Sequence, residues 1–141
     1  MHSYDDVYSF LARELGVDPT RLTPDTGLFD DLGVDGDDFF ELEQAFARHF
    51  NVDMSSYRWY FHHGEEGLNV GGLLSSAPYC RVEQIPVTPR LLLESANAGR
   101  WMLEYPSHEL PTRRYDIVVN LAILVGFVLL ALYALFRKFM G

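Results

Sequence analysis

The feature that most constrains this chain is a long apolar run near its C-terminus. Residues Ile117 to Phe136 read IVVNLAILVGFVLLALYALF, with no charge and with Asn120 as the only strongly polar side chain. At about 1.5 Å per residue a helix over this run is roughly 30 Å long, enough to cross the bilayer core. A soluble helix of that length would show a polar face. The sequence therefore predicts one transmembrane helix over 115–138, acting as a tail anchor.

The residues around this run bear on its orientation. Arg113 and Arg114 precede it, and Arg137 and Lys138 follow it, so the positive-inside bias is nearly balanced. The N-terminal stretch MHSYDDVYSFLAREL lacks the basic start and apolar core of a secretory signal. We therefore expect a single-pass membrane protein with its N-terminal domain in the cytoplasm.

Charge is distributed unevenly along the chain. Residues 1–60 hold thirteen Asp and Glu against four Arg, whereas residues 61–141 hold seven acidic and seven basic residues. An acidic N-terminal domain repels nucleic acid and attracts basic protein partners. Cys80 is the only cysteine, so no internal disulfide can form, in keeping with a reducing compartment.

The most informative stretch within the acidic part runs from Leu32 to Phe50. It starts with a turn and continues as a helix whose first turn is rich in carboxylates, which favour the positive end of the helix dipole. Its apolar residues recur at spacings of three, four and four, which indicates one buried stripe of an amphipathic helix. That stripe consists of Phe39, Leu42, Phe46 and Phe50.

Two further helices are predicted. The first covers Tyr4 to Leu15, with Ser3 as its N-cap and Gly16 after its end; the second covers Thr88 to Ala98, with Thr88 as its cap and Gly99 as its stop. The inner face of the helix at 4–15 should consist of Val7, Tyr8, Leu11 and Leu15. That of the helix at 88–98 should consist of Leu91, Leu92, Ser95 and Ala98. Leu22 and Leu28 should anchor the loop that leads from the helix at 4–15 to the stretch 32–50.

The remaining segments are less regular. Ser55 to Phe61 could form a short helix or a strand, because periodicity cannot decide at this length. Residues 62–87 are rich in Gly and read as an inserted loop, with a possible hairpin ending in Cys80 to Val87. Residues 102–114 contain two prolines and read as a linker.

The stretch 32–50 resembles the second helix of an acyl carrier protein. The family pattern is leucine-glycine-any-aspartate-serine-leucine-aspartate, then two residues and glutamate-leucine. The serine that carries phosphopantetheine in that family falls on Gly36, and the following leucine falls on Asp37. The Asp35 to Asp38 turn is also similar to that of a bacterial carrier-like family of unknown function. The positions in register are Leu32, Gly33, Asp35, Asp38, Glu41 and Leu42.

This resemblance implies a mainly α fold: a small acyl-carrier-like helical bundle over 1–101 with an insertion at 62–87, plus the transmembrane helix. Since Gly36 offers no hydroxyl, we expect a non-catalytic pseudo-carrier without a cofactor, which binds a basic protein through its acidic second helix. The alternative is a carrier modified at an unconventional site, although Ser55 and Ser56 lie at the other end of that helix. The expected contact residues are Asp35, Asp37, Asp38 and Glu41, with Asp30 and Asp31 as further candidates; a role for these acids as helix caps alone stays open.

Metal and catalytic patterns are weak. The run from Asp31 to Gly36 partly mimics a calcium loop but has Leu42 where a bidentate Glu belongs. His49, His62 and His63 could bind zinc only with a fourth ligand, and an exposed polar loop is the simpler interpretation of the adjacent histidines. Cys80 has no partner motif. We therefore expect neither a metal site nor an enzyme.

Overall fold

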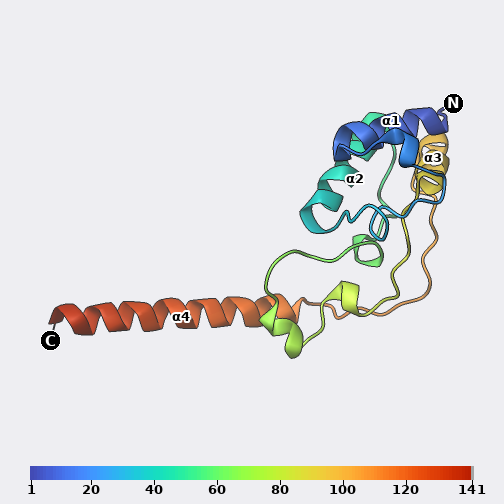
Figure 1. Ribbon diagram of the computed structural model, residues 1–141. Helices are drawn as coiled ribbons and strands as arrows, with labels where there is room; N and C mark the ends of the chain where they lie inside the picture. Colours follow the sequence, from blue (N-terminus) through green and yellow to red (C-terminus); the bar gives the residue numbers. More distant parts are fainter. Residues whose placement is uncertain (141) are drawn as a thin grey trace. The chain divides into compact units, whose positions relative to one another are not determined.

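Helices supply the regular structure of the computed structural model, which describes residues 1–140 (Figure 1). Within that range there is no β-strand, so the hairpin considered for residues 80–87 is wrong, while the mainly α fold with one long apolar C-terminal helix is confirmed. The α-helices are α1 (Tyr4–Leu15), α2 (Gly36–Phe50), α3 (Pro89–Ala98) and α4 (Tyr115–Met140), and the 3-10 turns are η1 (Pro19–Arg21), η2 (Trp59–Phe61), η3 (Val70–Leu73) and η4 (Pro78–Cys80).

The chain divides into two compact units. One consists of residues 1–66 and 82–108 and contains α1, α2 and α3; we call it the bundle. The other consists of residues 67–81 together with the chain from 109 onward, and contains η3, η4 and α4; we call it the helix–loop unit. Part of the glycine-rich insertion thus belongs with the apolar helix and not with the bundle.

The helix boundaries of the bundle follow local capping chemistry. Ser3 forms a capping box with Asp6 at the start of α1, and the Thr88 hydroxyl accepts the Leu91 N–H at the start of α3. Gly16 and Gly99 end these helices in the left-handed conformation that favours glycine. These ends confirm the sequence prediction.

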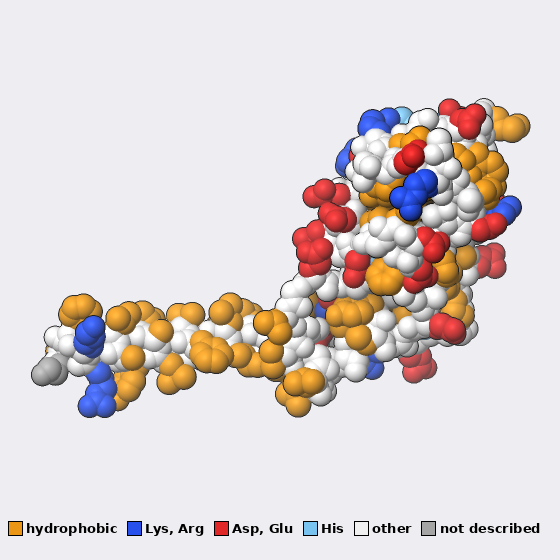
Figure 2. Space-filling model, in the orientation of Figure 1, with side chains coloured by type: hydrophobic (Ala, Val, Ile, Leu, Met, Phe, Trp, Pro, Cys, Tyr) orange, Lys and Arg blue, Asp and Glu red, His pale blue; other side chains and the backbone are white. Residues whose placement is uncertain are grey.

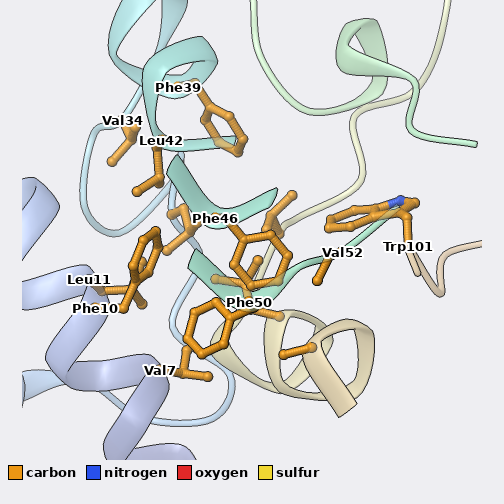
Figure 3. Packing of buried hydrophobic residues seen from close by; sticks show 14 of the residues in the cluster. Val7, Phe10, Leu11, Val34, Phe39, Leu42, Phe46, Phe50, Val52 and Trp101 are labelled. Atoms are coloured by element: carbon orange, nitrogen blue, oxygen red, sulfur yellow. The ribbon is translucent and has the colours of Figure 1, made fainter. Parts of the chain in front are cut away.

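Aromatic side chains from α1 and α2 form the centre of the bundle (Figure 3). Phe10 meets Phe46 and Phe50 with ring centroids 6.0 and 5.4 Å apart, both in edge-on geometry. Leu22 and Leu28 are buried as predicted. Two inner-face predictions are wrong. In α1 Phe10 is buried, whereas the predicted Tyr8 is only partly buried, and in α3 Ala96 is buried, whereas the predicted Ala98 is exposed.

A short backbone pairing joins the ends of α2 and α3. Asp53 donates its N–H to the Gly99 carbonyl at 2.9 Å, and Trp101 donates its N–H to the Asp53 carbonyl at 2.9 Å. This isolated parallel bridge places Trp101 in the core, where its side chain is 4% exposed. The residues after α3 therefore help to close the bundle.

The helix–loop unit contains α4, whose 26 residues span about 39 Å at the standard rise. It is long and apolar enough to cross a membrane, and none of its most hydrophobic window is buried. Figure 2 shows hydrophobic side chains along its length. The turn η3 packs against the first turns of α4 (Figure 1).

Candidate functional site

The head of α2 is the position where the sequence resemblance would place a carrier's functional serine. Asp35 is the N-cap in an extended conformation, and Asp37 and Asp38 occupy the first turn with exposed side chains. Their charges lie at the positive end of the helix dipole and stabilise it. The same carboxylates remain available to a partner from outside.

Gly36, at the serine position, is buried and has a φ of +52°. A side chain is strained in that backbone conformation. A Cβ added to Gly36 would also overlap the side chain of Glu66. The position therefore lacks a hydroxyl and has no room for one without a shift of its neighbours.

The segment from His62 to Glu66 covers this position. One oxygen of Asp35, Oδ1, accepts hydrogen bonds from the Gly36 N–H and the Gly64 N–H, both at 2.8 Å. The ring of His63 stacks on that of Phe39 with centroids 4.8 Å apart and planes at 17°. Asp35 thus ties the covering segment to the start of the helix, in addition to capping it.

His62 holds the covering segment on the bundle. The Tyr105 hydroxyl oxygen accepts from the Trp101 Nε1–H at 2.9 Å and from the Arg58 N–H at 3.1 Å, so its own proton goes to His62 Nε2 at 2.7 Å. His62 Nδ1 therefore carries the ring proton and donates it to the Ile85 carbonyl at 2.8 Å. Burial lowers the pKa of His62 to about 4, which keeps the ring neutral.

These contacts correct the interpretation of the two adjacent histidines. His62 and His63 are 1% and 6% exposed, so they belong to the interior and not to an exposed polar loop. Within residues 1–140 no three His, Cys, Asp or Glu side chains gather as metal ligands. Cys80 is an exposed free thiol in the helix–loop unit.

The outer surface of α2 carries the predicted contact residues. Asp37, Asp38 and Glu41, which we call the acidic face, are all exposed. Figure 2 shows acidic side chains gathered on the side of the bundle that holds α2. The candidates outside α2 are also exposed, although Asp31 accepts the Gly27 N–H at 2.6 Å and so stabilises its own loop.

Two further residues of this surface were missed from the sequence. A recess of about 190 Å³ is lined by Glu14 and Leu15 of α1 and by Asp38, Glu41 and Leu42 of α2. Glu14 joins the acidic face only through folding. Phe40 is 51% exposed, and its position off the apolar stripe of α2 could have revealed this.

Glu43 was also missed, although it lies on the inner side of α2. Glu43 and Tyr57 are among the residues that line an apolar cavity of about 10 Å³. Glu43 Oε2 and the Tyr57 hydroxyl are buried without a hydrogen bond of ordinary geometry. Burial raises the pKa of Glu43 to about 7, and nearby Tyr57 offsets only part of that rise. Burial, and then the Glu43 charge, raise the pKa of Tyr57. Glu43 lies about one helical turn from both Phe39 and Phe46, and this spacing could have shown from the sequence that Glu43 faces inward.

Gly36→Ser should destabilise the bundle by about 1 kcal/mol, because a side chain is forced into a left-handed backbone conformation. Urea unfolding followed by tryptophan fluorescence measures this effect in the full chain, since Trp59 and Trp101 both lie in the bundle. Adding Glu66→Ala removes the overlap with the new side chain but leaves the backbone strain. Stability equal to that of the wild type in Gly36→Ser would contradict the conformation described for Gly36.

Comparison with known proteins adds to this geometry. The chain is 30% identical over 74 residues to an acyl carrier protein of Helicobacter pylori (strain J99), a stretch that covers 52% of this chain and 88% of that protein. No solved structure matches the chain. Residues 3–104, which include α1 to α3, match the family described as a protein of unknown function (DUF1493). The chain therefore belongs to the DUF1493 family and has similarity to acyl carrier protein over about half of its length.

Proposed function

We propose that this chain is a membrane-anchored pseudo-carrier: a non-catalytic, acyl-carrier-like domain that binds a basic protein partner through α2 and carries no phosphopantetheine. The observation that carries the proposal is the contrast between two parts of one helix. The acidic face is open to solvent, while Gly36 at the serine position is buried under residues 62–66.

The character of the exposed surface supports protein binding. Phe40 lies one turn from Asp37 and next to Glu41, so an aromatic ring projects among carboxylates. Exposed aromatic residues commonly act as binding anchors, and surrounding charges steer a complementary partner. The recess between Glu14, Asp38 and Glu41 has the size and charge to receive an Arg or Lys side chain of that partner.

The anchor is the second element of the proposal. We infer that α4 spans the membrane over Ile117 to Phe136, with Tyr115 and Tyr133 near the two interfaces. The acidic bundle would then lie on the cytoplasmic side of a bacterial inner membrane.

Charge reversal tests the binding surface. In Asp37→Lys, Asp38→Lys, Glu41→Lys we expect capture of a partner by the detergent-solubilised full chain to fall at least about tenfold, because complementary charges become repulsive. A matched control, Glu83→Lys, Glu94→Lys, Glu104→Lys, changes the net charge equally at exposed positions elsewhere on the bundle. Quantitative mass spectrometry of crosslinked complexes compares the two variants. Equal capture by both variants would contradict partner binding through the acidic face, and would leave its residues with a role as helix caps alone.

Intact mass separates the pseudo-carrier from a true carrier. The wild-type chain co-expressed with a phosphopantetheinyl transferase should keep its unmodified mass. A gain of one phosphopantetheine arm would overturn the proposal and direct attention to Ser55 and Ser56, which are exposed beyond the far end of α2. Replacement of both serines by Ala would then show whether they carry the arm.

A further inference from the structure

The turn η3 is fastened to the first turns of α4 by a closed set of polar contacts. Asn69 donates from Nδ2 to Asp116 Oδ2 at 2.9 Å and accepts at Oδ1 from Asn120 Nδ2 at 2.9 Å. Asn120 Oδ1 in turn accepts the Gly71 N–H at 2.8 Å. Arg114 donates from Nε to Asp116 Oδ1 at 2.9 Å and from Nη2 to Asp116 Oδ2 at 2.6 Å, and Asp116 is 1% exposed. The polar side chains at the start of α4 are therefore satisfied within this unit.

Close packing fixes the position of the turn. Gly71 is buried, and a Cβ at this residue would overlap the backbone carbonyl of Asp116, which cannot move aside as a flexible side chain could. The backbone N–H groups of Gly72, Leu74 and Ser75 have acceptors within residues 69–71. These pairings reduce the number of unpaired backbone groups that the turn would bring into a lipid interface.

The outer surface of this turn is apolar. The run from Gly67 to Ala77 contains no charged residue. Single exposed leucines are ordinary on soluble proteins, but a group of them next to a transmembrane helix needs a covering partner. The exposed fractions are 94% for Leu68, 46% for Val70, 86% for Leu73 and 80% for Leu74.

The attachment points set the depth of the turn. Asp116 and Asn120 flank the residue at which the apolar span begins, Ile117, so η3 lies level with the first turn of the span. That level corresponds to the boundary between headgroups and hydrocarbon. Figure 2 shows hydrophobic side chains both along α4 and next to its N-terminal end. The surface of α4 that faces lipid thus continues onto the turn.

We propose that residues 68–74 form an interfacial membrane contact in which Leu68, Leu73 and Leu74 enter the lipid at the head of α4. The proposal rests on the proposed role of α4 as a transmembrane anchor. Residues 68–74 would then face the lipid at the boundary between the headgroups and the hydrocarbon of the bilayer. The polar contacts of Asn69 and Asn120 hold the three leucines at that depth.

Depth-dependent quenching tests this contact in the full chain. In a Cys80→Ser background, an environment-sensitive NBD fluorophore is attached to Leu73→Cys, to Val128→Cys in the middle of α4, or to Arg48→Cys on the exposed surface of α2. Each protein is reconstituted at low density in phosphatidylcholine vesicles that contain lipids with a nitroxide at acyl position 5 or 12. Tryptophan fluorescence identical to that of the wild type confirms that each labelled bundle is folded.

The three labels should give three different results. The label at 73 should be quenched about twofold more by the shallow nitroxide than by the deep one, the label at 128 should show the reverse order, and the label at 48 should be quenched by neither. A second label at Leu68→Cys should behave like the label at 73.

Two results would overturn the proposal in distinguishable ways. A label at 73 that stays unquenched while the label at 128 is quenched would refute the interfacial turn and leave the anchor intact. If such a label were also blue-shifted, the leucines would be covered by a second copy of the chain and not by lipid. An unquenched label at 128 would refute the transmembrane anchor, and the interfacial contact with it.

Discussion

Val125→Arg together with Leu129→Arg is expected to release the full chain from membranes. The Leu, Ile, Val and Phe side chains of residues 117–136 favour insertion by about 4 to 8 kcal/mol in total, and each arginine at the centre of a span opposes it by roughly 3 kcal/mol. Two arginines, together with the loss of the two apolar side chains, therefore cancel most or all of the driving force. The protein should move from the carbonate-resistant membrane fraction to the soluble or aggregated fraction.

A matched pair of substitutions controls for changes in helix packing. Val125→Ala with Leu129→Ala alters the same positions but keeps the helix apolar, so this variant should remain integral to the membrane. Carbonate extraction and vesicle flotation measure the difference between the two variants. Retention of the arginine variant as an integral membrane protein would show that α4 is not what anchors the chain.

Glu43→Gln should stabilise the bundle by roughly 2 kcal/mol at pH 8, and this advantage should shrink toward pH 4.5. The ordinary pKa of a Glu side chain is 4.5, whereas the pKa of Glu43 in the folded chain is about 7, because burial penalises its charge. Between these values only the folded state keeps the proton, so folding stability falls as the pH rises and stays low above 7. The gain is roughly 2 kcal/mol, less than a fully buried carboxyl group with this pKa would give, because part of the Glu43 carboxyl group still meets solvent.

His62 contributes with the opposite sign. Its pKa is lowered from 6.5 to about 4, so between these values only the unfolded state holds the proton and stability rises with pH. The two groups partly cancel in the wild-type profile below pH 6.5. The difference between wild type and Glu43→Gln isolates the carboxyl group, because His62 is common to both proteins.

Urea unfolding of the full chain in detergent, followed by tryptophan fluorescence from pH 4.5 to 8.5, measures this difference. Glu41→Gln is the matched control, since it makes the same chemical change at an exposed position of the same helix. Parallel stability profiles for wild type and Glu43→Gln would show that the carboxyl group reaches solvent freely. Tyr57→Phe removes the hydroxyl next to Glu43 and should move the pH window upward, since Tyr57 lowers the pKa of that carboxyl group.

The sequence predicted the elements whose signals are local. Ser3, Thr88, Gly16 and Gly99 mark helix ends because capping depends on a few neighbouring residues. The spacing of the phenylalanines in α2 fixed its buried side, and the uncharged run from 117 to 136 fixed the long apolar helix. Each of these signals is contained within one element, so no tertiary information was needed.

The candidate site was predicted only in part, because its decisive contacts join residues far apart in the chain. The cover over Gly36 depends on Asp35 accepting the Gly64 N–H, and on a histidine held by Tyr105 and Ile85. The pair of histidines suggested a polar loop, since nothing in the local sequence showed that their partners would enclose them. Glu14 likewise joined the acidic face only when α1 packed next to α2.

By itself, the sequence determined where the four α-helices lie, which part of the chain is acidic, and that a hydroxyl is missing at Gly36. Only the tertiary structure decided that Gly36 is covered, that Glu43 is partly buried, and that the glycine-rich turn packs on the head of α4. The physical reason is the distance along the chain over which each kind of interaction acts. Capping and amphipathicity act over a few residues, whereas burial and hydrogen bonding of polar groups depend on which distant segments pack together.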